Sequence, residues 1–112
     1  MSLKGIKMYL TAKEKKQIKN EIIERLKKIE TIRKLIIFGS FLNADNPNDI
    51  DIAVIDDNKQ DYLSLALAYR KKIRSLAKKI PIDIFPINEV SNKNSFFIEE
   101  INKGEVIYER RN

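Results

Sequence analysis

The sequence of 112 residues contains neither cysteine nor histidine. Without cysteine the chain can form no disulfide and offers no thiolate nucleophile. Without histidine it lacks the commonest general base and the commonest zinc ligand. Any catalysis must therefore use carboxylates, lysine, tyrosine, serine or a metal ion bound by carboxylates.

Long apolar runs are missing as well. No window holds 18 uninterrupted apolar residues, so no transmembrane helix is predicted. The first ten residues lack the continuous apolar stretch of a secretory signal, and we expect a cytoplasmic protein. An apolar fraction of 43% and this chain length suit one globular domain over residues 1–112. Residues 1–8 are expected to be disordered or partly vector-derived, with Met8 nearer the natural start.

Acidic residues are outnumbered by basic ones, 16 to 22, which gives a net charge of +6. Such a surplus can mark a nucleic-acid surface. However, Lys, Ile and Asn are all abundant, as in chains from compositionally biased genomes, and positive charge also attracts substrate phosphates. We favour background composition together with attraction of substrate phosphates, and keep nucleic-acid binding as the weaker alternative.

Three segments show the apolar spacing of helices. Thr11 and Glu14 have the form of a capping box, Asp61 can cap the second helix, and Pro81 and Gly104 follow the ends of the second and third. The predicted helices are Ala12–Ile29, Tyr62–Lys79 and Ser95–Asn102.

Four short apolar runs predict strands. They are Leu35–Phe38, Asp49–Ile55, Ile82–Ile87 and Val106–Tyr108, the last as an edge strand. A short loop between the first two permits a hairpin, and the long helix before the third permits a crossover to a parallel or mixed neighbour. The sequence therefore predicts a small α/β (α+β) fold, in which helices pack on a mixed sheet.

Two acids stand one residue apart at the start of the second predicted strand. Alternate strand residues share a face, so Asp49 and Asp51 would point the same way with Cα atoms roughly 6.6 Å apart. Unpaired carboxylates this close raise each other's pKa, and no arginine is near in the sequence. A divalent cation such as Mg²⁺ would neutralise them, while Ile50 and Ile52 anchor the opposite face.

A third acid, Asp83, lies in the apolar run IPIDIFPI. If this strand neighbours the one that carries Asp51, three carboxylates converge, enough to hold two metal ions about 3.5–4 Å apart for phosphoryl transfer. Asp83 would then stand beside the attacking hydroxyl and take its proton. The simpler alternative for all three is a set of solvated acids on an exposed strand face.

Gly39 and Ser40 follow the first predicted strand. Glycine allows a sharp turn and close approach of a ligand, and backbone N–H groups with a serine hydroxyl can hold phosphate oxygens. The pair is uninformative alone, but it stands between an apolar strand and an Asp-x-Asp strand. In that context it predicts a phosphate-binding turn.

The stretch FGSFLNADNPNDIDIAVI resembles the signature of the polymerase β-type nucleotidyltransferase superfamily. The short chain and its terminal FFIEEINKGEVIYE resemble the minimal nucleotidyltransferases of bacteria and archaea, and the likeness covers about Ile18 to Tyr108. The resemblance implies a nucleotidyltransferase fold and contacts from Gly39 and Ser40 to a nucleoside triphosphate. It also implies one or two Mg²⁺ ions and three catalytic, metal-binding carboxylates: Asp49, Asp51 and Asp83.

The same resemblance implies an activity and a partner. The protein would transfer a nucleoside monophosphate, AMP from ATP, to a hydroxyl of an acceptor and release pyrophosphate. Minimal members often pair with a helical HEPN-type protein in a toxin–antitoxin module, where the nucleotidyltransferase is the antitoxin. We therefore expect a HEPN-type acceptor, and in so small a domain a partner chain or a homodimer could complete the site.

Two positions depart from that family pattern. Many members have an arginine or similar residue after the serine and a second glycine four residues beyond it, where this chain has Phe41 and Ala44. Lys34, Asn43 and Asn48 are candidates to compensate. The departure leaves an alternative from another functional class, in which a subunit of the same fold has lost nucleotide affinity and neutralises its partner by contact alone.

Overall fold

A computed structural model describes residues 10–44, 47, 49–87 and 95–110, with only the backbone of residues 95–98. Its elements are α1 (Ala12–Leu26), β1 (Ile32–Phe38), α2 (Ser40–Asn43), β2 (Ile50–Asp56), α3 (Tyr62–Ala77), β3 (Ile82–Ile87), α4 (Ser95–Asn102) and β4 (Glu105–Glu109). The expectation for residues 1–8 lies outside the described residues. Within the described part of the chain, no helix is both long and apolar enough to cross a membrane.

The four strands form one mixed sheet in the order β3-β2-β1-β4. β1 pairs antiparallel with both β2 and β4, and β2 pairs parallel with β3. The helix α3 makes the crossover that a parallel pair requires. The predicted hairpin, crossover, edge strand and fold class are therefore confirmed.

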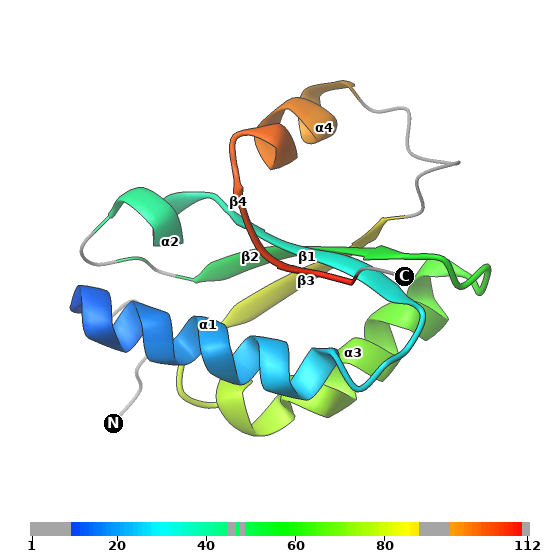
Figure 1. The fold of residues 1–112 in the computed structure, drawn as a ribbon, viewed down its shortest axis with the longest axis horizontal. Helices are drawn as coiled ribbons and strands as arrows, with labels where there is room; N and C mark the ends of the chain where they lie inside the picture. Colours follow the sequence, from blue (N-terminus) through cyan, green and yellow to red (C-terminus); the bar gives the residue numbers. More distant parts are fainter. Residues whose placement is uncertain (1–9, 45–46, 48, 88–94, 111–112) are drawn as a thin grey trace.

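The sheet has a helix layer on each face. Figure 1 shows α1 and α3 along one face and α4 on the other. Ile52 and Val54 of β2 belong to the large core with α1 and α3, whereas Ala53 and Ile55 belong to a smaller core that includes Ile101 of α4. By strand alternation, Asp51 shares the face of Ala53, which is the α4 face.

The predicted caps of the two long helices are present, but both helices end earlier than predicted. The Thr11–Glu14 capping box forms at α1, and Asp61 accepts a hydrogen bond from the Ser64 N–H at α3. α1 ends at Leu26 rather than at residue 29, because the chain turns there toward β1. Arg110 donates to the carbonyl of Lys27 at 3.0 Å and satisfies part of the exposed helix end.

The strands differ from prediction mainly at their charged ends. β1 begins three residues before the predicted start, because Ile32 and Lys34 pair in register with Asp56 and Ile55 of β2. β2 begins at residue 50, one later than predicted, and β4 is one residue longer at each end. β3 and α4 have the predicted bounds, and the short α2 was not predicted.

Candidate metal and nucleotide site

The parallel pairing of β2 with β3 brings two of the predicted acids together. Asp51 and Asp83 are partners in register, and Asp49 lies just before β2. One carboxylate oxygen from each of the three residues lies within 4.8 Å of the others. The predicted convergence of the three acids is therefore observed, while their roles in metal binding and catalysis stay predictions.

The three carboxylates differ in exposure and in electrostatics. Asp49 and Asp51 are half-buried, and Asp83 is exposed. Burial, together with the charges of Asp49 and Asp83, raises the pKa of Asp51 to about 6. Burial also raises the pKa of Asp49, and the neighbouring Asp83 adds to that rise. In the described part of the chain, no salt bridge reaches any of the three.

This donor set fits a hard divalent cation. Three carboxylates supply only oxygen ligands, which Mg²⁺ and Mn²⁺ prefer. The pKa of Asp51 is raised first by burial and then by the charges of Asp49 and Asp83, and a bound cation would oppose both effects because an opposite charge within about 4–6 Å favours the ionised form. The residues present therefore suit such an ion.

Gly39 is required where the turn meets the carboxylates. Its φ of 81° lies in a region that residues with a side chain rarely adopt. A Cβ atom at this position would lie 2.6 Å from the Oδ2 of Asp51. Gly39 and the following Ser40 are both exposed, so the turn that touches Asp51 is open to a ligand.

The two positions that depart from the family pattern have defined surroundings. Phe41 is fully buried in the large core, and the ammonium of Lys15 lies 5.5 Å from the centroid of its ring. The same ammonium donates to the carbonyl of Ala44 at 2.6 Å. Lys15 was not predicted to lie here, and no local pattern could indicate it because 29 residues separate it from Ala44.

The proposed compensating residues are not all close to the turn. Lys34 was a wrong candidate: it pairs in register with Ile55 and contacts Glu109, at the other end of the sheet from Asp51. Asn43 is exposed on α2, and Asn48 lies outside the described residues.

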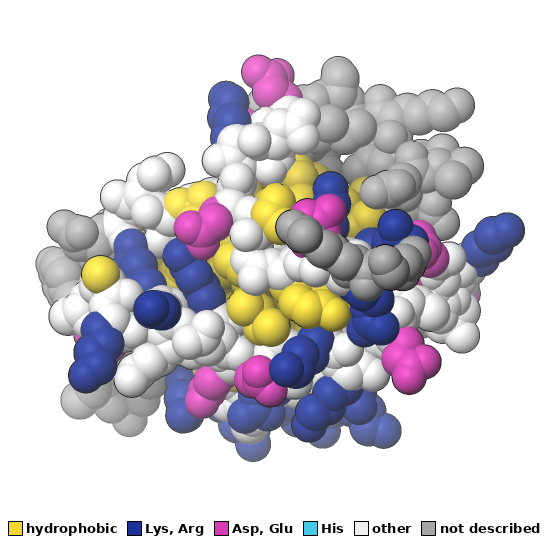
Figure 2. Space-filling view, viewed as in Figure 1, with side chains coloured by type: hydrophobic (Ala, Val, Ile, Leu, Met, Phe, Trp, Pro, Cys, Tyr) yellow, Lys and Arg dark blue, Asp and Glu magenta, His cyan; other side chains and the backbone are white. Residues whose placement is uncertain are grey.

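The basic surplus gathers on the helix layer. Figure 2 shows Lys and Arg side chains along the edge where Figure 1 places α1 and α3. No acidic residue occurs between Tyr62 and Lys79, and six basic side chains in this range are exposed. They are Arg70, Lys71, Lys72, Arg74, Lys78 and Lys79. This surface belongs to the layer on the face opposite Asp51.

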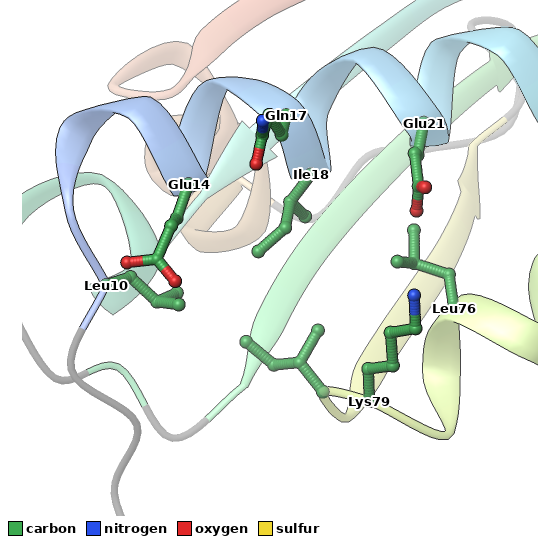
Figure 3. A pocket seen from close by; sticks show the side chains of 8 residues that line it. Leu10, Glu14, Gln17, Ile18, Glu21, Leu76 and Lys79 are labelled. Atoms are coloured by element: carbon green, nitrogen blue, oxygen red, sulfur yellow. The ribbon is translucent and has the colours of Figure 1, made fainter.

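A cavity of about 300 Å³ also lies in this layer, between α1 and α3. Figure 3 shows Glu14, Glu21 and Lys79 around an apolar floor that includes Ile18. None of the predicted site residues lines it. Its two glutamates and its apolar lining do not suit a triphosphate, so the acidic cluster remains the candidate site.

Comparison with known proteins agrees with the fold. The profile of the family described as "Polymerase beta, Nucleotidyltransferase" matches residues 20–112. No curated protein matches the sequence.

Three solved structures illustrate the fold. A chain from the complex of tri-AMPylated Shewanella oneidensis HEPN toxin with MNT antitoxin has a TM-score of 0.63 and 21% identity, over 86% of this chain and 73% of that chain. A chain from the toxin–antitoxin MntA–HepT has a TM-score of 0.61 and 21% identity, over 85% of this chain and 73% of that chain. A chain from a toxin–antitoxin structure with AMP-PNP has a TM-score of 0.64 and 23% identity, over 83% of this chain and 74% of that chain. At these identities the likeness concerns the fold.

Proposed function

The chain belongs to the polymerase beta nucleotidyltransferase family, and on that premise we propose that it transfers AMP from ATP to a hydroxyl group of a partner protein with the aid of Mg²⁺. One observation carries the proposal: three carboxylates converge within 4.8 Å beside an exposed glycine turn. A rigid strand pair holds Asp51 and Asp83, which is the support that a metal site needs.

The reaction can be assigned to the residues of this chain. The acceptor oxygen attacks the α-phosphorus of ATP, the bond from that phosphorus to the α,β-bridging oxygen breaks, and pyrophosphate leaves. Asp83 is the exposed carboxylate and takes the proton of the attacking hydroxyl. Asp49, Asp51 and Asp83 would hold one or two divalent ions, and a bound ion would supply charge neutralisation and Lewis acidity at the phosphates. Gly39 and Ser40 contact the triphosphate.

The similar structures support the choice of acceptor. One contains a tri-AMPylated HEPN toxin with its MNT antitoxin, and another contains AMP-PNP. We extend this to the present chain as an antitoxin whose acceptor is a HEPN-type protein. A domain of this size has little surface with which to enclose both the nucleotide and the acceptor, so the partner chain would complete the site.

The test is a labelling experiment with [α-³²P]ATP, Mg²⁺ and the HEPN-type protein encoded next to this chain. We expect label on the partner, and about a 1,000-fold loss, or more, in the double variant Asp49→Asn, Asp51→Asn, as expected when charge stabilisation is removed. Asp57→Asn is the matched control, because Asp57 is an exposed acid at the other end of β2 whose side chain pairs with Arg33 at 3.0 Å. Equal labelling by the double variant would refute the assignment.

The second candidate is neutralisation by contact alone. The observation that favours it is the burial of Phe41, which leaves no side-chain cation at the position where many family members have one. In that case the double variant would still neutralise the partner protein in cells, although it transfers no label. Loss of both properties in a folded double variant supports the enzyme.

A further inference from the structure

The short helix α2 links the glycine turn to the rest of the protein. It has only four residues, and its N-cap residue Gly39 makes no side-chain hydrogen bond. The Ala44 N–H donates to the Ser40 carbonyl at 2.8 Å and closes the single turn. A helix of one turn is unstable in isolation, because nucleation costs more than one hydrogen bond returns. Contacts from elsewhere must therefore hold it.

Lys15 supplies one of those contacts from α1. Its ammonium donates to the carbonyl of Ala44, the C-cap of α2, and lies over the ring of Phe41, which is buried in the core. Both the carbonyl end of a helix and the face of an aromatic ring attract a cation. The side chain thus connects α1 to the start and the end of the turn that follows Ser40.

Lys15 differs from its neighbours on the same helix. Lys13 and Lys16 are exposed, whereas Lys15 is half-buried and its hydrogen bond is partly shielded from water. The capping box at Thr11 fixes the first turn of α1, from which Lys15 projects. The capped first turn of α1 therefore holds the backbone of Lys15, and the Ala44 carbonyl holds its ammonium.

We propose that Lys15 is a positioning residue for the nucleotide turn, an inference that rests on the proposed function. By tying the C-cap of α2 to α1 it fixes the turn that begins at Gly39, where the backbone lies against Asp51, and it adds a positive charge at the end of that turn. Its two contacts, the Phe41 ring and the Ala44 carbonyl, lie at the positions that depart from the family pattern.

The test compares Lys15→Met, which keeps the apolar stem but removes charge and donors, with Lys15→Arg and the control Lys16→Met. The first readout is calorimetric titration with AMP-PNP and Mg²⁺. We expect Lys15→Met to weaken binding about tenfold, because a turn that lacks this charge-assisted hydrogen bond must be ordered when the nucleotide binds. Lys15→Arg should restore most of it, and Lys16→Met should stay within about twofold, as for an exposed charge. In labelling assays KM for ATP should rise while kcat changes little.

A second readout does not need nucleotide binding. Hydrogen exchange of the Ala44 amide, which bonds to Ser40, should be about tenfold faster in Lys15→Met, while amides in the middle of α1 keep their rates. Unchanged exchange at Ala44 would overturn the proposal. Faster exchange with undiminished nucleotide affinity would also overturn it, because Lys15 would then be structural only. If the wild-type protein binds no nucleotide, the proposed function fails, and the exchange rates still decide whether Lys15 holds the turn.

Discussion

The two ends of β2 carry acids in opposite circumstances. At its C-terminal end Asp56 is only 2% exposed, yet the Tyr69 hydroxyl and the Asn58 N–H both donate to its carboxylate. At the N-terminal end Asp51 is half-buried beside Asp49 and Asp83. Burial raises the pKa of the Tyr69 phenol far above its usual range, so it remains a donor.

The difference separates an acid that stabilises the fold from the three acids that we propose as ligands of a divalent ion. A buried carboxylate is tolerated when donors satisfy it. A cluster of carboxylates that no described lysine or arginine pairs with is costly, and such clusters are common at functional sites. Burial alone therefore does not mark the candidate site on this strand, whereas clustered carboxylates without an ion pair in the described part of the chain do.

The largest effect on stability is expected at the satisfied end. Asp56→Ala removes the acceptor for two donors, one of them the buried Tyr69 hydroxyl, and should lower the free energy of unfolding by about 3 kcal/mol. Asp57→Ala, at an exposed acid, should cost less than about 1 kcal/mol. Urea unfolding measures both. A loss at Asp56 no larger than at Asp57 would break the contrast between the two ends.

An intermediate effect is expected at the turn beside the unsatisfied end. Gly39→Ala forces a side chain into backbone with φ of 81° and against Asp51. We expect about 2 kcal/mol of destabilisation together with weaker nucleotide binding, measured by thermal unfolding and calorimetry. Gly104→Ala is the comparison: its Cβ would lie 2.5 Å from the Ile37 carbonyl, so it should also destabilise. Only Gly39→Ala should weaken nucleotide binding beyond its effect on folding.

The smallest effect is a pH dependence of the metal-free protein. The folded-state pKa of Asp51, about 6, lies above its ordinary value of 3.8, so the folded state binds the proton more tightly. Stability should therefore fall as pH rises from about 4 to about 6. Solvent screening limits the effect to about 1 kcal/mol.

Asp51→Asn should flatten this pH profile and make the metal-free protein slightly more stable than wild type at pH 7. Thermal unfolding in the presence of EDTA measures both quantities. If the stability of the wild type instead rose between pH 4 and 6, and Asp51→Asn removed that rise, the electrostatic description of the site would be contradicted.

Much of the fold could be predicted because its signals are local. The capping box at Thr11, the cap at Asp61 and the bounds of β3 and α4 follow from residues within a few positions of each other. The start of β1 could not, because the charged residue Lys34 belongs to the strand only through its pairing with Ile55 of β2 and Glu109 of β4. α2 could not, because four residues without a side-chain cap give no periodicity.

The site was predicted as far as sequence spacing reaches. Asp49 and Asp51 are close in the chain, and Asp83 could be added only on the condition that its strand is adjacent, which the parallel pairing meets. The Lys15–Ala44 and Asp56–Tyr69 contacts depend on packing between elements, because their residues lie 29 and 13 positions apart in the chain. Such contacts carry no sequence pattern of their own.

The most direct test of a cation site is diffraction from crystals of this protein soaked with Mn²⁺ and AMP-PNP, collected at a wavelength with manganese anomalous signal. The predicted result is one or two anomalous peaks within coordination distance of Asp49, Asp51 and Asp83, with the triphosphate against Gly39 and Ser40. Bound nucleotide with manganese elsewhere, or no peak among the three carboxylates at saturating Mn²⁺, would contradict the account.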